Sequence, residues 1–381
     1  MLRCNILSIF LAFSLLAGAQ EWKVVRENPQ KAFPKTVAAG NYSGIAHLHD
    51  DIYAVVSDKS DSALYFNFRI LVNPKTGELE QVENLGFTER TDGTLNDGKP
   101  WQGQEKGFDH EAIVKVSDST LVIASEGCCR LKEYPILPTS ADAAKVGYQQ
   151  NLWESRWASS DFYPNYNFES LAFDFVRQYL WTIPESTLRK DGQPATPQNG
   201  LANQLRLMRL DWGKMKENRN KEEYSEQVSS KKDSRYMTPY VYQMDQPSTH
   251  KKADIYVMGV SELCALPDGQ LLVLEREAFI PKIKIGAFCK CKLYLINPLN
   301  SEEFSMKENF SADTPFLKKR LLAEWKTGLA LSKRSFANYE GMCLGPKLED
   351  GSQVVILLSD SQDQYAGVLK DWFKTIVIRK E

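Results

Sequence analysis

Five copies of a two-strand unit constrain the fold of this chain more than any other feature of its sequence. Each copy begins with a polar residue at the head of an apolar, strand-like run. A turn rich in Gly, Pro, Asn or Asp follows, and a second apolar run then ends on a carboxylate. The first position is held, in chain order, by Ser43, Glu111, Glu169, Glu262 and Glu340. The closing carboxylates are Asp58, Glu126, Glu185, Glu275 and Asp360.

Further strand candidates follow the two-strand units, for example residues 292–296 and 320–325 after the fourth. Four antiparallel strands per repeat in a radial array are the plan of a β-propeller. Long helical periodicity is scarce, and the charged stretch 213–235 is expected to be a solvated excursion. We therefore predict an all-β protein, a β-propeller with five recognisable four-stranded repeats and five or six blades. Residues 22–25 are expected to pair with the last blade and close the ring.

The first 19 residues have the features of a cleavable signal peptide. Arg3 supplies a positive charge, residues 6–16 are apolar, and Ala17-Gly18-Ala19 is a small-residue cleavage site. An apolar run of this length is too short for a bilayer, which needs about 20 residues. We expect a secreted or periplasmic protein in which residues 20–381 form a single domain.

Six cysteines remain after the signal peptide, and an even number in an exported chain permits disulfides. The sequence does not choose a pairing among Cys128, Cys129, Cys264, Cys289, Cys291 and Cys343.

The charge is nearly balanced, with 47 Lys and Arg residues against 49 Asp and Glu residues. A nucleic-acid-binding protein would carry a basic excess. We therefore expect a monomer that binds a small molecule, with no nucleic acid partner and no membrane span.

The repeated acids predict a shared site, because equivalent positions in successive blades point the same way relative to the axis. Two carboxylates about 4 Å apart repel by roughly 4 kcal/mol at an effective dielectric constant of 20. A hard cation such as calcium, which takes 6–8 oxygen ligands, would relieve that repulsion. The predicted metal ligands are Glu111, Glu169, Glu262, Glu340, Asp58, Glu126 and Asp360. The alternative is that each Glu binds backbone N–H groups of a neighbouring blade and holds the ring together.

Basic residues follow the closing carboxylates, which suits an anionic substrate held beside a metal. The expected substrate-binding residues are Lys59, Arg130, Arg189 and Arg276. Arg276 follows Glu275 directly, and these two residues together with Glu185 are the predicted catalytic groups. The alternative is that the basic side chains form salt bridges between blades.

The ordered motifs resemble the Phytase-like family, also described as "esterase-like activity of phytase", whose members are commonly exported bacterial proteins. The resemblance is carried by Asn-Tyr-Ser-Gly-Ile, Asp-His-Glu-Ala, Asn-Phe-Glu-Ser-Leu-Ala, Ser-Glu-Leu and Asn-Tyr-Glu-Gly, each with its closing acid. It covers almost the whole mature chain. It implies a propeller whose acids hydrolyse phosphoesters with calcium. His110 stands where Pro is usual and Ser43 replaces an acid, and both departures bear on the number of metal ligands.

The expected function is therefore metal-assisted hydrolysis of phosphate esters by an exported propeller. In this hypothesis the repeated acids hold calcium, Arg276, Arg189 and Lys59 orient the phosphate, and Glu275 or Glu185 accepts a proton. Two alternatives stay open. One is a non-catalytic propeller that binds a ligand or protein and whose acids are structural, and the other is a calcium-dependent lactonase or carboxylesterase.

Overall fold

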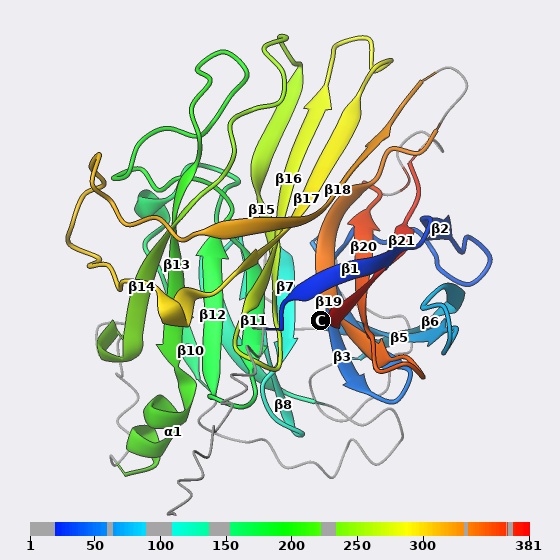
Figure 1. The fold of residues 1–381 in the computed structure, drawn as a ribbon, viewed down its shortest axis with the longest axis horizontal. Helices are drawn as coiled ribbons and strands as arrows, with labels where there is room; N and C mark the ends of the chain where they lie inside the picture. The colour runs from blue at the N-terminus through cyan, green and yellow to red at the C-terminus, as the bar shows by residue number, and fades with distance from the viewer. Residues whose placement is uncertain are drawn as a thin grey trace, which may run out of the picture.

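The computed structural model describes residues 20–58, 64–88, 109–136, 153–221, 234–330, 334–362, 364 and 369–381. Within these residues the chain forms a ring of five antiparallel sheets, with one helix of more than a single turn (Figure 1). The predicted all-β propeller is confirmed, and the number of blades is five. We number the blades 1–5 in chain order.

Each blade has four main strands that run in order from the axis outward. Blade 1 consists of β3 (Tyr42–His49), β4 (Ile52–Ser57), β5 (Tyr65–Val72) and β6 (Leu79–Thr88). Blade 2 consists of β7 (His110–Lys115), β8 (Thr120–Ser125), β9 (Arg130–Pro135) and β10 (Glu154–Arg156). Blade 3 consists of β11 (Phe168–Asp174), β12 (Tyr179–Pro184), β13 (Gln204–Asp211) and β14 (Met237–Gln243). Blade 4 consists of β15 (Ile255–Ala265), β16 (Leu271–Ile280), β17 (Phe288–Ile296) and β18 (Lys319–Gly328).

Blade 5 is completed by the start of the chain. Its strands are β19 (Asn338–Lys347), β20 (Gln353–Asp360), β21 (Trp372–Lys380) and, outermost, β1 (Trp22–Glu27). The short strand β2 (Lys31–Ala32) also pairs with β21. Trp22 lies opposite Lys380 in this pairing, so the two ends of the propeller meet in one sheet. The predicted pairing of residues 22–25 with the last blade is confirmed.

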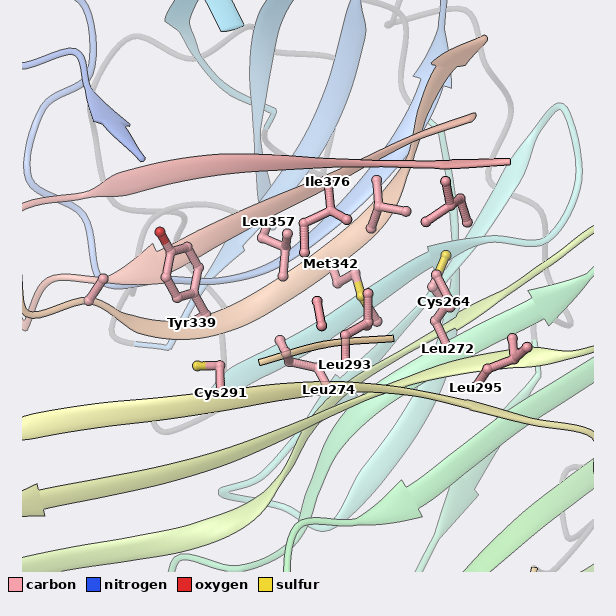
Figure 2. Packing of buried hydrophobic residues seen from close by; sticks show 14 of the residues in the cluster. Cys264, Leu272, Leu274, Cys291, Leu293, Leu295, Tyr339, Met342, Leu357 and Ile376 are labelled. Carbon is pink, nitrogen blue, oxygen red and sulfur yellow. The ribbon is translucent and has the colours of Figure 1, made fainter. Parts of the chain in front are cut away.

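The hydrophobic core lies between the blades, where the faces of neighbouring sheets pack together. The cluster between blades 4 and 5 shows the pattern, with Leu274 and Leu293 from blade 4 against Leu357 and Ile376 from blade 5 (Figure 2). All four side chains are fully buried. Both faces of each sheet are covered by the neighbouring blades. Strands such as β16 therefore consist almost entirely of buried residues.

The five inner strands β3, β7, β11, β15 and β19 contact one another in sequence around the axis. Their backbones approach closely, which explains the small residues after the motif position. A Cβ atom added to Gly44 would lie 2.7 Å from the carbonyl oxygen of Glu111 in the next blade. A Cβ atom added to Gly341 would lie 2.8 Å from the carbonyl oxygen of Ser43.

The remaining elements lie outside the ring of blades. Helix α1 (Trp212–Lys221) follows β13 in the charged stretch for which the sequence predicted only an excursion. None of the six cysteines beyond residue 19 forms a disulfide in the structure. Within the described residues, none of the helices is long and apolar enough to cross a membrane.

Candidate functional site

Three of the repeated glutamates occupy β-bulges near the start of inner strands. In β11 the pairing with β12 shifts between Phe168 and Ser170, so Glu169 is the extra residue. The same shift leaves Glu111 as the extra residue of β7 and Glu340 as that of β19. A bulge redirects the extra side chain, and bulges are frequent beside functional sites. The predicted equivalence of these three residues is therefore present in the structure.

Blade 4 is out of step with the predicted equivalence by one residue. In β15 the pairing shift lies between Val260 and Glu262, so Ser261 holds the bulge position. Blade 1 also has a serine there, because the pairing of β3 is irregular between Tyr42 and Ile45, around Ser43. The bulge positions around the ring are Ser43, Glu111, Glu169, Ser261 and Glu340.

Glu262 consequently does not join the other three glutamates. Its side chain is buried, and Oε1 accepts hydrogen bonds from the backbone N–H groups of Leu171 and Leu263, each at 2.9 Å. Burial raises the pKa of this carboxyl well above its usual value, and the backbone N–H groups of Leu263, Leu171 and Met342 partly oppose the rise. These donors belong to the inner strands of blades 3, 4 and 5. The contacts of Glu262 are therefore those expected if this residue binds backbone N–H groups of neighbouring blades and holds the ring together.

The closing position of the second strand is also displaced in blade 4. The backbone N–H groups of Glu126 and Glu185 donate to carbonyl oxygens two residues before the bulge, at 2.8 Å in both blades. Asp58 and Asp360 hold the same place in blades 1 and 5. In blade 4 the residue at this place, opposite Gly259, is Arg276. Four blades therefore close on an acid and one closes on an arginine.

Glu275 points to the other face of its sheet, because a shift of one residue along a strand reverses the side chain. Its carboxylate accepts hydrogen bonds of 2.6 Å from the Tyr242 hydroxyl and from Lys319 Nζ. Burial raises the pKa of Glu275, and Lys319 partly opposes the rise. Of the three residues predicted to be catalytic, the structure brings Glu185 and Arg276 together and places Glu275 in this separate network.

Arg276 lies at the centre of the converging acids. Its Nη2 atom donates to Glu185 Oε1 at 2.5 Å and to Glu169 Oε2 at 3.2 Å. Its Nη1 atom donates to Glu340 and, at 3.1 Å, to Asn338 Oδ1. The side chain is only 4% exposed, and its Nε atom has no acceptor among the described residues. The three carboxylates raise the pKa of Arg276 although burial, the largest influence, opposes them.

Gly259 provides the space for this arrangement. A Cβ atom at this position would lie 2.3 Å from Cγ and 2.6 Å from the carbonyl oxygen of Glu185. The glycine therefore allows the carboxylate of blade 3 to approach the arginine of blade 4. This requirement explains why the fourth copy lacks the Asn or Asp found at the same position elsewhere.

A second group of acids lies on the side of blades 1 and 2. Asp58, Asp109 and Glu111 each offer one carboxylate oxygen, and these three atoms lie within 4.8 Å of one another. Sequence reasoning missed Asp109 as a ligand candidate. The available signal was its place two residues before the bulge, where blades 1, 3 and 5 carry asparagine. Asp109 adopts a left-handed backbone conformation, with φ of 49°, as short polar side chains can.

The two groups form one electrostatic unit. Burial raises the pKa of Glu111, and the charges of Glu169, Glu340, Asp58 and Asp109 add to the rise. Burial likewise raises the pKa of Glu340, with Asp360, Asp58 and Glu185 contributing and Arg276 opposing. We call these eight carboxylates the acid cluster: Asp58, Asp109, Glu111, Glu126, Glu169, Glu185, Glu340 and Asp360.

Glu126 belongs to the cluster and has a pKa of about 7, raised from 4.5 chiefly by burial. The charges of Glu185 and Asp109 add to the rise, whereas the backbone N–H of Asn167, at 3.1 Å from Oε1, lowers the pKa. Burial therefore raises the pKa of each of the five glutamates of the cluster, and the charge of Arg276 opposes that rise at Glu126, Glu169, Glu185 and Glu340.

The other basic residues predicted to bind substrate have different contacts. Arg130 is buried in blade 2, with Nη1 3.9 Å from Glu154 Oε1. It adds to the effect of burial in lowering the pKa of His110 to about 3. Arg189 donates from Nε to the carbonyl oxygen of Phe162 at 2.6 Å, and its guanidinium lies 4.6 Å from the ring centre of Tyr163. Lys59 lies outside the described residues.

Comparison with known proteins gives one family match. The model of a family named Phytase-like, described as "esterase-like activity of phytase", matches residues 37–362. No curated protein matches the chain. Among solved structures, a putative gluconolactonase has a TM-score of 0.33 and 9% identity, with 94% of this chain and 99% of that one covered. Virginiamycin B lyase from Staphylococcus aureus has a TM-score of 0.30 and 8% identity, with 93% and 99% covered.

Proposed function

The chain belongs to the Phytase-like family, and from that premise we propose that it is an exported, calcium-assisted hydrolase of phosphate esters. The observation that carries the proposal is the pairing of two features in one cluster. Asp58, Asp109 and Glu111 present three oxygens within 4.8 Å of one another, and Glu169, Glu185 and Glu340 of the same acid cluster hold the buried Arg276. Oxygen ligands and a guanidinium are the groups that hold a hard cation and a phosphate.

The donor set fits calcium. Ca²⁺ binds oxygen ligands at about 2.3–2.6 Å, so two ligands on opposite sides of the ion are about 4.6–5.2 Å apart. The spacing of the three oxygens does not exceed that span. The acid cluster also holds eight carboxyl groups, with Arg276 as their basic partner among the described residues, and a divalent cation would relieve the repulsion between the ionised carboxylates. A bound calcium ion would polarise a phosphate oxygen and lower the pKa of a coordinated water.

The residues of the chain have separate roles in this proposal. Asp58, Asp109 and Glu111 hold the ion. Arg276 is fixed by Glu169, Glu185 and Glu340 and contributes its positive charge to binding of the phosphate. A fixed guanidinium needs no reorganisation when negative charge develops on the phosphate oxygens during the reaction.

Glu340 is the proposed proton acceptor. It contacts Arg276 directly and lies within electrostatic reach of Asp58, so it stands between the two groups of acids. Its side chain is 15% exposed, against 1% for Glu185, which leaves it more accessible to a water molecule. General-base assistance of this kind typically contributes 10²–10⁴-fold to a rate, and we expect a loss of about that size in Glu340→Gln.

The experiment uses the mature protein after treatment with EDTA and removal of the chelator. We expect hydrolysis of p-nitrophenyl phosphate, bis-p-nitrophenyl phosphate or inositol hexakisphosphate to appear only when CaCl₂ is added. The Asp109→Asn variant should require much more calcium for the same rate. Asp118→Asn is the matched control, because this carboxylate lies in the same blade and is fully exposed.

Two results would contradict the proposal. One is phosphate release that is the same with and without calcium and equal in the wild type and Asp109→Asn. The other is the absence of phosphate release from all three substrates, together with an unfolding temperature that calcium does not change.

A further inference from the structure

A pair of buried thiols lies directly behind Arg276. Cys289 and Cys291 are on β17, two residues apart, so their side chains point to the same face of the strand. Their Sγ atoms are 3.8 Å apart, and neither residue is exposed. Figure 2 shows Cys291 beside Tyr339 in the cluster between blades 4 and 5. The function proposed above makes no use of either thiol.

The thiol pair is connected to the acid cluster through Arg276 and Asn338. Cys291 lies opposite Arg276 in the pairing of β16 with β17. The Cys289 thiol lies 4.0 Å from Asn338 Oδ1, the oxygen that accepts the 3.1 Å hydrogen bond from Arg276 Nη1. Asn338 Nδ2 in turn donates to Glu340 at 2.6 Å. Asn338 is therefore a single side chain that contacts both the Cys289 thiol and Glu340 of the acid cluster.

The two thiols have different chemistry because of their surroundings. The pKa of the Cys289 thiol is lowered, mainly by the hydrogen bond with Cys291 and also by the positive charge of Arg276. Burial raises the pKa of the Cys291 thiol. A lowered thiol pKa favours attack on an oxidant, and a second thiol within reach can then resolve the product to a disulfide. The short distance between the two sulfur atoms and the positive charge of Arg276 near Cys289 both favour this reaction.

We propose that Cys289 and Cys291 are a site of reversible oxidation by hydrogen peroxide, which joins them in a disulfide next to Arg276. The Cys289 sulfur attacks one peroxide oxygen, the O–O bond breaks, and a sulfenic acid and one water form. The Cys291 sulfur then attacks the Cys289 sulfur, the S–O bond breaks, and a second water leaves. Two thiols and one peroxide give one disulfide and two waters, so atoms and electrons balance.

The strand geometry permits this bond with a small movement. Residues two apart on a strand have Cα atoms separated by about 6.4–6.8 Å, from a rise of 3.2–3.4 Å per residue. Disulfides occur at Cα separations up to about 6.8 Å. The small size of peroxide matters, because both thiols are buried and Asn338, which contacts Cys289, is only partly exposed.

The test treats reduced protein with hydrogen peroxide, unfolds it in the presence of iodoacetamide and measures the masses of its peptides. We expect the peptide with Cys289 and Cys291 to carry no alkyl group and to be two hydrogen atoms lighter than the same peptide with two unmodified thiols. Treatment with dithiothreitol before alkylation should restore two alkylated thiols. In Cys291→Ser the sulfenic acid on Cys289 should persist and react with dimedone. Cys264→Ser, a buried thiol on β15, should behave as the wild type does.

Cys128 serves as an internal control for the oxidant, because it is partly exposed. If Cys128 is oxidised while Cys289 and Cys291 remain fully alkylated, the pair is an inert part of the core and the proposal is wrong. The mass measurement requires no enzymatic activity and no calcium. Its outcome is therefore independent of whether the chain hydrolyses phosphate esters.

Discussion

At the scale of single residues, the site depends on one arginine that replaces an acid. Arg276, which is buried, holds three carboxylates together, and removing one partner of such a group leaves uncompensated buried charge. The arginine can take this place because Gly259 leaves space for Glu185. The chemistry of the site therefore rests on a glycine that contributes no side chain of its own.

We expect Gly259→Ala to destabilise the protein by about 1–3 kcal/mol, the usual cost of overpacking. The added methyl group would meet the carboxylate and the backbone of Glu185, and backbone cannot move aside cheaply. Urea unfolding of the two proteins measures the difference. Gly213→Ala is the control, because its Cβ would meet only the Gln178 side chain at 3.3 Å. Equal stability of Gly259→Ala and the wild type would show that Glu185 is not confined as described.

Glu262 and Glu111 should respond differently to the same substitution. Glu262→Gln keeps an oxygen that accepts the N–H groups of Leu171 and Leu263, so we expect an unchanged increase in unfolding temperature on adding calcium. Glu111→Gln removes a charge from the acid cluster and should reduce that increase. Differential scanning calorimetry with and without CaCl₂ makes the comparison. If calcium raised the unfolding temperature less in Glu262→Gln but not in Glu111→Gln, then Glu262, and not Glu111, would be the residue that contributes to calcium binding.

At the scale of strands, the sequence predicted the elements well and the register less well. The two-strand units, the propeller plan and the closing segment at residues 22–25 follow from apolar periodicity, and the structure contains them. The assignments of Glu262 and Glu275 were one residue out of step, because both strands of blade 4 carry an acid beside the true position. A β-bulge has no composition signal of its own, so side-chain identity alone could not locate it.

Asp109 shows the same limit from the opposite direction. It lies outside the repeated acid positions, and the folded arrangement of blades 1 and 2 is what places it beside Asp58 and Glu111. By contrast, the convergence of Glu111, Glu169 and Glu340 could be predicted, because identical register in three blades brings identical positions to the axis. Agreement among copies made those predictions reliable, and the odd copy produced the errors.

Strand β1 should be essential for stability, although it contributes nothing to the acid cluster. Trp22 packs into the core between blades 4 and 5, and its Nε1–H donates to Asp268 Oδ2 at 2.7 Å. We expect Trp22→Ala to cost about 3–5 kcal/mol. Lys23→Ala is the control, because this side chain of β1 is 55% exposed. Equal unfolding midpoints of the two variants in urea would contradict the closing role of β1.

At the scale of the whole molecule, the acid cluster should make stability depend on pH and calcium together. The pKa of Glu126 rises from 4.5 to about 7 on folding, so the folded state binds an extra proton between these values. A raised carboxyl pKa gives stability that is full below the unfolded pKa and lost as pH rises through the folded pKa. Glu111, Glu169 and Glu340 shift in the same direction.

We therefore expect the unfolding temperature of EDTA-treated protein to fall between about pH 5.5 and about pH 8. Calcium binds the ionised carboxylates, so its stabilising effect should be larger at the higher pH. Calorimetry at the two pH values, with and without CaCl₂, measures both effects. The Glu126→Gln variant should show a shallower fall, and a rise of stability with pH in the chelated wild type would refute the prediction.

The single arginine among five equivalent positions also makes the acid cluster asymmetric about the axis of the ring. Around a ring of identical blades, a ligand would have five indistinguishable rotational settings. With Arg276 in one blade and carboxylates in the other four, those settings differ in energy. If the substrate were a cyclic polyol esterified with several phosphates, only the phosphate turned toward blade 4 would meet the guanidinium. Hydrolysis at the acid cluster would then release one positional isomer of the product in preference to the others.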